Sequence, residues 1–547
     1  MAETPTTPAP TPEMVNITVN GTAIRVPKGM NVIEAAQRVG VFIPHYCYHP
    51  KLPIAGNCRM CMVEIGEPVF TPDRQPVLGT DGKQKIAMQP RLAIGCNTPV
   101  KEGMVVVTNS AAVKQAQNAV LEFLLINHPL DCPICDQAGE CKLQEYSVDY
   151  GQSASRFAEP KVHKPKAVDL GPRIALDDER CILCTRCIRF TRDIAGDDAL
   201  GIVNRGSYST LTAYPGKAFD NNYTLNTVDI CPVGALTSKD FRFQMRVWFL
   251  KESKSICTSC GTGCNIIIGS REEKVYRYTP RENDAVNACW ICDYGRLNYK
   301  WIGREDRLKD VLVRGQKTTW PVALNEISDK LKKAPAGSVA MVVSARQTNE
   351  ELWLLKRLAD KFGALTDLVG RFGEGDKLLL NADRNPNKTG ARLIGICQMS
   401  LDSKTKMIAD NIHIGKVKTL IVFGEDVTKS GIGANLLGRL ETLIVSDILP
   451  NETTKLAHYL LPGCAHAEKR GTFTNVKGRV QKFMKAVEPP GDARPEWDFL
   501  HDLVYNVTGQ DDFLTIEGLF NQMAKEMPAF NGLTWASLGE TGVTVKI

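Results

Sequence analysis

The sequence has 547 residues, a length that allows several domains around a sizeable core. The hydrophobic fraction of 43% is ordinary, and the apolar runs are too short to span a membrane. The formal net charge of +6 is mild and the basic residues are interleaved with acidic ones, which does not indicate a nucleic-acid-binding surface. The outlier is the count of 18 cysteines. Disulfide frameworks are typical of small secreted domains, and the start of this chain does not resemble an export signal, so we expect the clustered cysteines to bind metal.

The first part of the chain predicts a tail followed by a small β-grasp domain over residues 15–110. Residues 1–14 are rich in Pro and Thr, which is typical of a disordered tail. Residues 15–26, VNITVNGTAIRV, alternate apolar and polar residues around an Asn-Gly pair and predict a hairpin. Asn31 and Gly40 then bracket an amphipathic stretch that predicts a short helix.

The first cysteine set lies in CYHPKLPIAGNCRMC and IGCNTP and comprises Cys47, Cys58, Cys61 and, as the expected fourth ligand, Cys96. Four thiolates can hold either zinc or a [2Fe–2S] cluster. The gap of ten residues between the first two cysteines departs from the plant-type ferredoxin spacing. The β-grasp pattern upstream nevertheless favours the [2Fe–2S] cluster.

The second set follows a stretch of helical periodicity over residues 111–127, in a predicted domain of residues 111–154. The sequence INHPLDCPICDQAGEC supplies three thiolates, those of Cys132, Cys135 and Cys141. A four-iron cluster needs a fourth ligand, and His128 is the nearest candidate. Spacing alone leaves open the alternative of an exposed loop histidine with a more distant fourth ligand.

The third set follows a proline-containing linker predicted at about residues 155–172. Within a predicted domain of residues 170–248, the motif CILCTRCIRF is completed by the remote Cys-Pro of DICPVGAL. Cysteines at every third position with a remote Cys-Pro are typical of a [4Fe–4S] cluster of bacterial ferredoxins, with structural zinc as the alternative. The predicted ligands are Cys181, Cys184, Cys187 and Cys231.

The fourth set lies in a predicted domain of residues 250–305. Its candidates are Cys257, Cys260 and Cys264 in CTSCGTGC and Cys292 in WICDYGR, with Cys289 as a rival for the last position. We expect the cysteines outside the four sets to be ordinary, partly buried thiols. These are Cys289, Cys397 and Cys464.

Residues 306–547 predict an α/β domain. SVAMVVSA, VKTLIVFGED and ETLIVSD are typical of buried strands, and TNEELWLLKRLADKFG between the first two predicts a helix. Strands that alternate with helices indicate a parallel, doubly wound sheet.

Four motifs occur in this order along the chain: GNCRMCMVE, NHPLDCPICDQAGECKLQ, ERCILCTRCIRF and DICPVGAL. Together they resemble the large iron–sulfur subunit of respiratory NADH:quinone oxidoreductase (complex I), and the resemblance extends over about residues 15–490. The resemblance implies one [2Fe–2S] cluster in the first set and a [4Fe–4S] cluster in each of the other three. In each implied cluster the side chains of the set bind the iron atoms. The resemblance also implies that His128 is the fourth ligand of the second set.

The C-terminal half resembles the scaffold of molybdopterin oxidoreductases, notably in LLPGCAHAEKRGTFTNVKGRVQ. Tyr294 stands where those enzymes place a lysine near the pterin, and the chain ends sooner than theirs do, so we expect no molybdopterin. The expected fold is therefore a multidomain α/β protein. Its β-grasp [2Fe–2S] ferredoxin and [4Fe–4S] ferredoxin-like domains precede a truncated molybdopterin-oxidoreductase-like α/β scaffold.

The resemblance implies an electron-relay component of the enzyme with no catalytic residues of its own. No Gly-rich dinucleotide fingerprint follows a predicted strand. The implied partners are the flavin subunit that binds NADH and the connecting iron–sulfur subunits that lead to the quinone site, without nucleic acid and without direct membrane insertion. The implied location is peripheral, on the cytoplasmic face of the bacterial inner membrane.

Two classes of alternative are an enzyme with its own catalytic centre, either an iron-only hydrogenase or a formate dehydrogenase, and a multi-zinc scaffold protein. An iron-only hydrogenase needs further cysteine motifs for its active cluster, whereas a formate dehydrogenase needs molybdenum or tungsten. A multi-zinc scaffold protein would be colourless and free of acid-labile sulfide.

Overall fold

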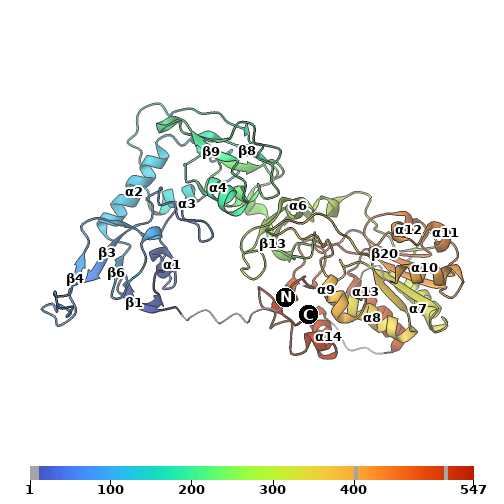
Figure 1. Cartoon of the computed structure of the whole chain (residues 1–547). Helices are drawn as coiled ribbons and strands as arrows, with labels where there is room; N and C mark the ends of the chain where they lie inside the picture. Colours follow the sequence, from blue (N-terminus) through green and yellow to red (C-terminus); the bar gives the residue numbers. More distant parts are fainter. Residues whose placement is uncertain (1–11, 399–403, 510–514) are drawn as a thin grey trace. The chain divides into compact units, whose positions relative to one another are not determined.

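A computed structural model describes residues 12–398, 404–509 and 515–547 (Figure 1). The chain forms two compact units, unit 1 over Met1–Trp248 and unit 2 over Phe249–Ile547. Of the tail predicted over residues 1–14, residues 1–11 lie outside the described part, and Met14 already belongs to the first strand. The finer domain boundaries stay predictions.

Unit 1 begins with the predicted hairpin, whose strands β1 (Met14–Val19) and β2 (Thr22–Pro27) pair in antiparallel register. Asn20 and Gly21 both have positive φ, of 46° and 85°, as a two-residue hairpin turn requires. The predicted helix is α1 (Val32–Gln37), and the Asn31 side chain caps it by accepting a hydrogen bond from the Glu34 N–H at 3.0 Å.

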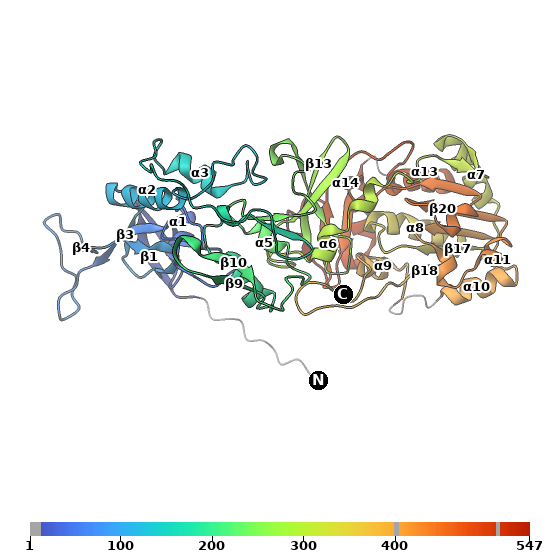
Figure 2. The same ribbon diagram turned by 90° about the horizontal axis from the view of Figure 1, so that it is seen from above.

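The largest sheet of unit 1 has the strand order β2-β1-β6-β3-β4, with β5 paired to β3 off this path, and its strands β1 and β6 run parallel. This mixed sheet beside α1 confirms the β-grasp prediction. The insertion between Cys61 and Cys96 contains β4 and projects from the sheet (Figures 1 and 2). The further strands are β3 (Met62–Pro68), β4 (Ile86–Met88), β5 (Ala93–Ile94) and β6 (Val105–Val107).

Apart from the 15-residue helix α2, the rest of unit 1 consists of short elements that leave long loops for the cysteines. The helix predicted at residues 111–127 is α2, which buries Val113 and Leu121. The linker predicted at about residues 155–172 is anchored to this helix, since Lys161 Nζ donates to the carbonyls of Leu125 and Ile126 at 2.9 and 2.7 Å. The remaining elements are α2 (Ala111–Leu125), α3 (Lys142–Asp149), β7 (Val168–Asp169), β8 (Ile174–Leu176), α4 (Arg186–Arg189), a π-helical turn (Phe190–Ile194), β9 (Leu200–Val203), β10 (Thr210–Ala213), α5 (Asn226–Asp229) and β11 (Leu236–Ser238).

Unit 2 opens with an antiparallel three-stranded sheet and a short helix that frame the fourth cysteine set. These are β12 (Lys251–Ile256), β13 (Asn265–Arg271), β14 (Lys274–Pro280) and α6 (Asp293–Leu297).

The predicted doubly wound domain follows as a seven-stranded sheet of order β16-β15-β21-β20-β19-β17-β18. The strands from β21 to β18 run parallel, whereas β15 and β16 form an antiparallel edge. The bounds are β15 (Leu312–Val313), β16 (Gln316–Lys317), β17 (Val339–Val343), β18 (Leu365–Leu368), β19 (Thr419–Phe423), β20 (Thr442–Asp447) and β21 (Tyr459–Pro462).

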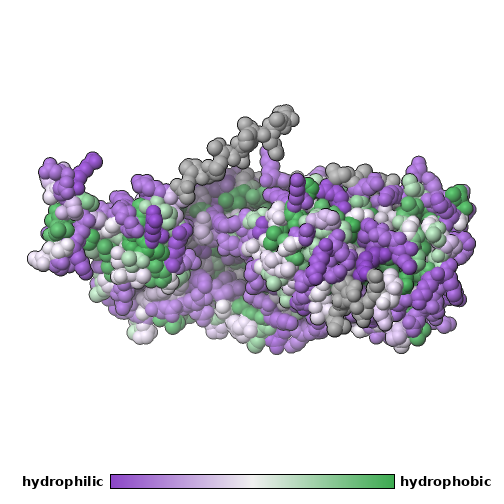
Figure 3. Space-filling model, turned by 90° about the horizontal axis from the view of Figure 1, so that it is seen from below, coloured by the Kyte–Doolittle hydropathy of each residue, from purple (hydrophilic) through white to green (hydrophobic). Residues whose placement is uncertain are grey.

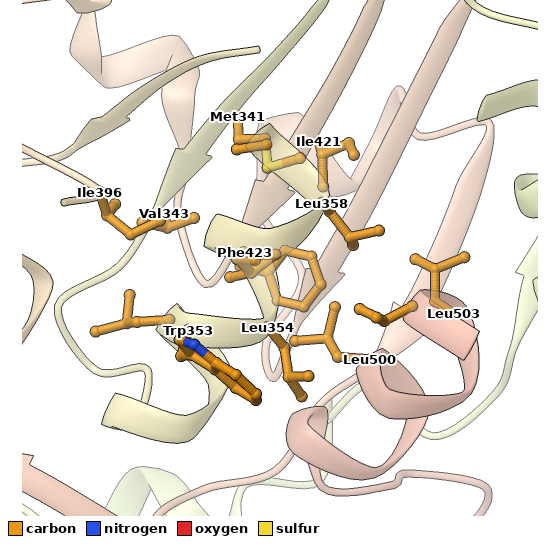
Figure 4. Close-up of a cluster of buried hydrophobic side chains, with 14 of the residues drawn as sticks. Met341, Val343, Trp353, Leu354, Leu358, Ile396, Ile421, Phe423, Leu500 and Leu503 are labelled. Carbon is orange, nitrogen blue, oxygen red and sulfur yellow. The ribbon is translucent and has the colours of Figure 1, made fainter. Parts of the chain in front are cut away.

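Alternate side chains of the parallel strands enter two separate cores, which explains why these strands are apolar throughout. Met341, Val343 and Phe423 pack under α7, α8, α13 and α14, with Trp353 of α8 fully buried among them (Figure 4). Their neighbour Val342 faces the opposite core, beside α10 and α11. The helices are α7 (Trp320–Lys332), α8 (Asn349–Phe362), α9 (Lys388–Ile394), α10 (Thr405–His413), α11 (Ala434–Leu437), α12 (Glu452–Lys455), α13 (Glu496–Thr508) and α14 (Ile516–Glu526).

A final three-stranded sheet joins β22 (Gly471–Thr474), β23 (Arg479–Phe483) and β24 (Val543–Thr544). On the face drawn in Figure 3, hydrophilic residues surround smaller apolar areas. None of the helices in the described ranges has the length and apolar character needed to cross a membrane.

Candidate metal centres

The first cysteine set is gathered at one end of the β-grasp sheet. Cys61 precedes β3, Cys96 lies in a 3-10 turn after β5, and Cys47 and Cys58 come from the loop between α1 and β3. The Cys47 N–H donates to Cys58 Sγ at 3.4 Å. Hydrogen bonds with the thiols of Cys58 and Cys96 lower the pKa of Cys47, and a hydrogen bond with Cys96 lowers that of Cys61. The four sulfurs therefore lie close together, and three of them are buried.

The second set surrounds a hollow with about 290 Å³ of empty space, part of it open to solvent. All four predicted ligands line it, namely His128, Cys132, Cys135 and Cys141. Burial, and next the positive charges of Arg180 and Lys161, lower the pKa of His128 to about 4. The imidazole is therefore neutral at pH 7 and has a lone pair for a metal.

Gly234, three residues beyond Cys231, also lines this hollow. A Cβ atom at Gly234 would lie 2.3 Å from Cys135 Sγ, closer than any real contact. The loop that carries a ligand of the third set therefore also forms a wall of the second, and only glycine fits there.

In the third set Cys184 is buried and the other three cysteines are half-buried. Its loop passes through Leu183 and Thr185, which both have positive φ, of 54° and 61°, before α4 begins. Burial, and next the charges of the neighbouring cysteines, raise the pKa of Cys181 to about 12 and that of Cys184 to about 11. Cys187 and Cys231 also have raised pKa values, and the charges acting on Cys187 include those of the other three. Thiols that oppose one another's ionisation in a buried site favour a bound cation that compensates their charge.

The fourth set lies in unit 2, with all four predicted cysteines buried. Cys257 follows β12, Cys264 precedes β13, and Cys292 caps α6 by accepting a hydrogen bond from the Gly295 N–H at 3.3 Å. A Cβ atom at Gly295 would stand 2.9 Å from Cys257 Sγ and 3.3 Å from Cys292 Sγ. Burial is the main cause that raises the pKa of Cys264, and the charges of Cys257, Cys260 and Cys292 raise it further. The four cysteine side chains therefore lie around one place.

The donor chemistry of the four sets fits iron–sulfur clusters, since each offers three or four thiols with at most one imidazole. In the described ranges no three His, Cys, Asp or Glu side chains are arranged to hold a single metal ion.

Contacts that the sequence did not predict connect the first and third sets. Arg189 Nη2 donates to the carbonyl oxygens of Cys47 at 2.5 Å and of Cys184 at 3.2 Å. Arg186 bonds the carbonyls of Tyr48 and Ile230. Each arginine thus bridges the two loops. The only signal in the sequence is the position of both arginines within the motif CILCTRCIRF.

Other contacts connect the second and third sets. The Lys142 N–H, next to Cys141, donates to the carbonyl of Pro232, next to Cys231, at 3.0 Å. Arg180, which precedes Cys181, lines the hollow of the second set and pairs with Asp131 at 2.9 Å.

Unit 2 also holds a hollow with about 800 Å³ of empty space at the carboxyl ends of β17, β19 and β20. This edge is where open α/β sheets bind ligands. Arg346, Asp447 and His466 line it. Tyr294 is half exposed, and the Arg384 guanidinium stacks on its ring at 4.8 Å.

The chain matches five family models. Their descriptions are a 2Fe-2S iron-sulfur cluster binding domain (residues 12–111), an NADH-ubiquinone oxidoreductase-G iron-sulfur binding region (117–156), the ferredoxin-like domain of NADH-quinone oxidoreductase subunit 3 (171–237), an NDSU1/NuoG-like 4Fe-4S domain of NADH-ubiquinone oxidoreductase (250–300) and molybdopterin oxidoreductase (365–506).

Similar proteins include the G subunit of the NADH-quinone oxidoreductase of Rickettsia typhi, 39% identical over 66% of this chain and 50% of the relative. The NADH-ubiquinone oxidoreductase 75 kDa subunit of Reclinomonas americana is 30% identical over 95% of this chain and 92% of the relative. The chain thus spans about half the length of the rickettsial relative. A crystal structure of an NAD+-reducing [NiFe]-hydrogenase in the H2-reduced state matches 43% of this chain and 91% of that chain at 30% identity, with a TM-score of 0.35.

Proposed function

Because the chain belongs to the family formed by the G and 75 kDa subunits of NADH-quinone oxidoreductases, we propose that it relays single electrons inside such an enzyme. The electrons come from a flavin subunit that binds NADH and go toward the quinone-reducing subunits. The observation that carries the proposal is the clustering of each predicted ligand set, above all the hollow lined by one histidine and three cysteines.

The proposed cofactors are one [2Fe–2S] and three [4Fe–4S] clusters, each held by one ligand set. An iron–sulfur cluster, when bound, accepts and releases one electron at a time at a potential set by its ligands, burial and hydrogen bonds. Sixteen side chains would bind and orient these centres. They are Cys47, Cys58, Cys61 and Cys96; His128, Cys132, Cys135 and Cys141; Cys181, Cys184, Cys187 and Cys231; and Cys257, Cys260, Cys264 and Cys292.

The contacts in unit 1 support a path with the third set in the middle. On one side, Arg189 joins the backbone of Cys184 to that of Cys47. On the other, one hydrogen bond joins Lys142 to Pro232, the neighbours of Cys141 and Cys231. The proposed path therefore runs from the first set through the third to the second, and from there to another subunit.

The proposed location is the cytoplasmic face of the bacterial inner membrane, as a peripheral part of a membrane complex. The proposed partners are the flavin subunit and the connecting iron–sulfur subunits.

The test is His128→Ala in the intact complex. We expect it to remove or convert one four-iron centre, visible by low-temperature EPR, and to slow electron flow from NADH to quinone. Reduction of an artificial acceptor at the flavin should continue, because that site precedes this chain in the path. An unchanged spectrum with full quinone reduction would refute the role of His128.

A further inference from the structure

We propose that Arg189 is a positioning residue for electron transfer. Its buried guanidinium holds the loops of the first and third ligand sets together and supplies the positive charge that raises the reduction potentials of both centres. The inference rests on the proposed function and goes beyond it, because it assigns a role to a side chain that is not a metal ligand.

The first argument is geometric. Arg189 uses its planar fork of donors on the backbone of both loops, since Nη1 donates to the Pro53 carbonyl at 2.5 Å and Nη2 to those of Cys47 and Cys184. Nε donates to Thr185 Oγ1 at 3.2 Å and fixes the plane of the group. Lysine has one charged nitrogen without this fork and cannot reproduce the arrangement.

The second argument concerns charge. Arg189 is 5% exposed, and no Asp or Glu of the described residues forms an ion pair with it. Arg180, equally buried, has such partners in Asp131 and Asp177. A buried charge is costly unless opposite charge compensates it, so Arg189 requires negative groups nearby.

The negative groups around Arg189 are the cysteines of the two sets and Asp193, whose carboxylate pairs with Arg192. Arg189 donates hydrogen bonds to the backbone of Cys47 and Cys184 and follows Cys187 by two residues. The positive neighbour is Arg186, which bridges the same two loops. The negative charge that compensates this buried cation is thus mainly that of the cysteine thiolates in the first and third sets.

The consequence follows from electrostatics. A reduced centre carries one more negative charge than an oxidised one, so a fixed positive charge beside it favours the reduced form. Because Arg189 touches the backbone of a ligand in each set, it should raise both potentials together. Removing its charge should lower both potentials, and the potential of the second centre, whose ligands Arg189 does not touch, should change less.

The test compares Arg189→Gln, Arg189→Lys and the control Arg192→Gln in the intact complex. Arg192 lies three residues farther along, is 54% exposed and pairs with Asp193 at 2.7 Å, so its loss removes the same charge at the surface. Redox titration followed by EPR measures the centres separately. In Arg189→Gln we expect the reduced-to-oxidised ratio of the first and third centres at a fixed potential to fall about tenfold, which is about 59 mV for one electron.

Arg189→Lys should keep both potentials near the wild-type values, because the charge remains, but should slow electron flow to quinone severalfold, because the bridge is lost. Arg192→Gln should change neither. Unchanged potentials in Arg189→Gln, or equal shifts in Arg192→Gln, would overturn the charge role. A wild-type quinone rate in Arg189→Lys would overturn the bridging role.

If Arg189→Gln fails to assemble a centre, Arg189→Lys decides. A centre restored by lysine at the wild-type potential supports the charge role, whereas a missing centre or a lowered potential overturns it. A wild-type complex without EPR signals from the first and third sets would instead refute the proposed function itself.

Discussion

His128 shows how the environment of one side chain prepares it to bind a metal. A histidine before a proline is weak evidence in a sequence, because its surroundings decide whether the ring is charged. Here burial and two positive neighbours lower the pKa of the imidazole to about 4, so the ring is neutral at neutral pH. The three cysteines of the set were evident from their spacing, whereas this environment came from Arg180 and Lys161, which are distant in sequence.

We predict that His128→Cys retains a four-iron centre but lowers its potential. A thiolate adds one negative charge where the imidazole has none, and histidine ligation raises potentials in other iron–sulfur proteins. EPR redox titration of the variant measures the change. A potential at or above that of the wild type would contradict histidine ligation.

We predict that Gly234→Ala disrupts the second centre, because the new Cβ would overlap Cys135 Sγ. The cost of such overpacking is about 1–3 kcal/mol, which the loop can meet by moving the cysteine away. Iron analysis should show a loss confined to one four-iron centre. Gly303→Ala is the control, because a Cβ there meets nothing within 4 Å, and an unaltered second EPR signal in Gly234→Ala would refute the prediction.

At the scale of elements, patterns with a local cause were predictable. The β1–β2 hairpin, the capped helices α1 and α8, and the buried strands β17, β19 and β20 all follow from short-range periodicity and turn residues. Strand β21 and the antiparallel edge formed by β15 and β16 were not predicted, since their few residues gain their pairing from distant neighbours. The anchoring of the linker was not predicted for the same reason, because its partners lie at the C-terminal end of α2.

Another long-range feature is a buried ion triad that joins two helices of unit 2. Lys469 Nζ lies 2.8 Å from carboxylate oxygens of Glu351 on α8 and of Glu496 at the start of α13, and all three residues are buried. We predict that Lys469→Met destabilises the chain by about 3–5 kcal/mol, because it leaves two buried carboxylates without a positive counter-charge.

Urea unfolding of the full chain measures this loss of stability. Lys418→Met is the matched control, since Lys418 pairs with Glu441 at the surface, at 2.7 Å, and surface pairs contribute about 0–1 kcal/mol. Equal unfolding midpoints for the two variants would show that the triad does not stabilise the unit.

At the scale of the whole molecule, buried histidines should make the chain sensitive to acid. Burial lowers the pKa of His466, which lies 3.1 Å from the Tyr278 hydroxyl, from 6.5 to about 3. Above pH 6.5 the ring is neutral in both the folded and the unfolded chain. As the pH falls from 6.5 toward 3, only the unfolded chain takes up the proton, so stability is lost across this window.

We therefore predict that His466→Gln loses less stability than the wild type between pH 6.5 and pH 4. The difference between the two free energies of unfolding should change by at most about 1.4 kcal/mol per pH unit. Urea unfolding at several pH values measures it, with the exposed His163→Gln as control. Parallel curves for wild type and His466→Gln would contradict the assignment.

The most direct measurement is metal and acid-labile sulfide analysis of the anaerobically purified chain, with EPR of the reduced protein. The account predicts a brown protein with about fourteen iron atoms and as much sulfide, the sum for one [2Fe–2S] and three [4Fe–4S] clusters, without molybdenum. A colourless chain that contains zinc and no acid-labile sulfide would contradict it.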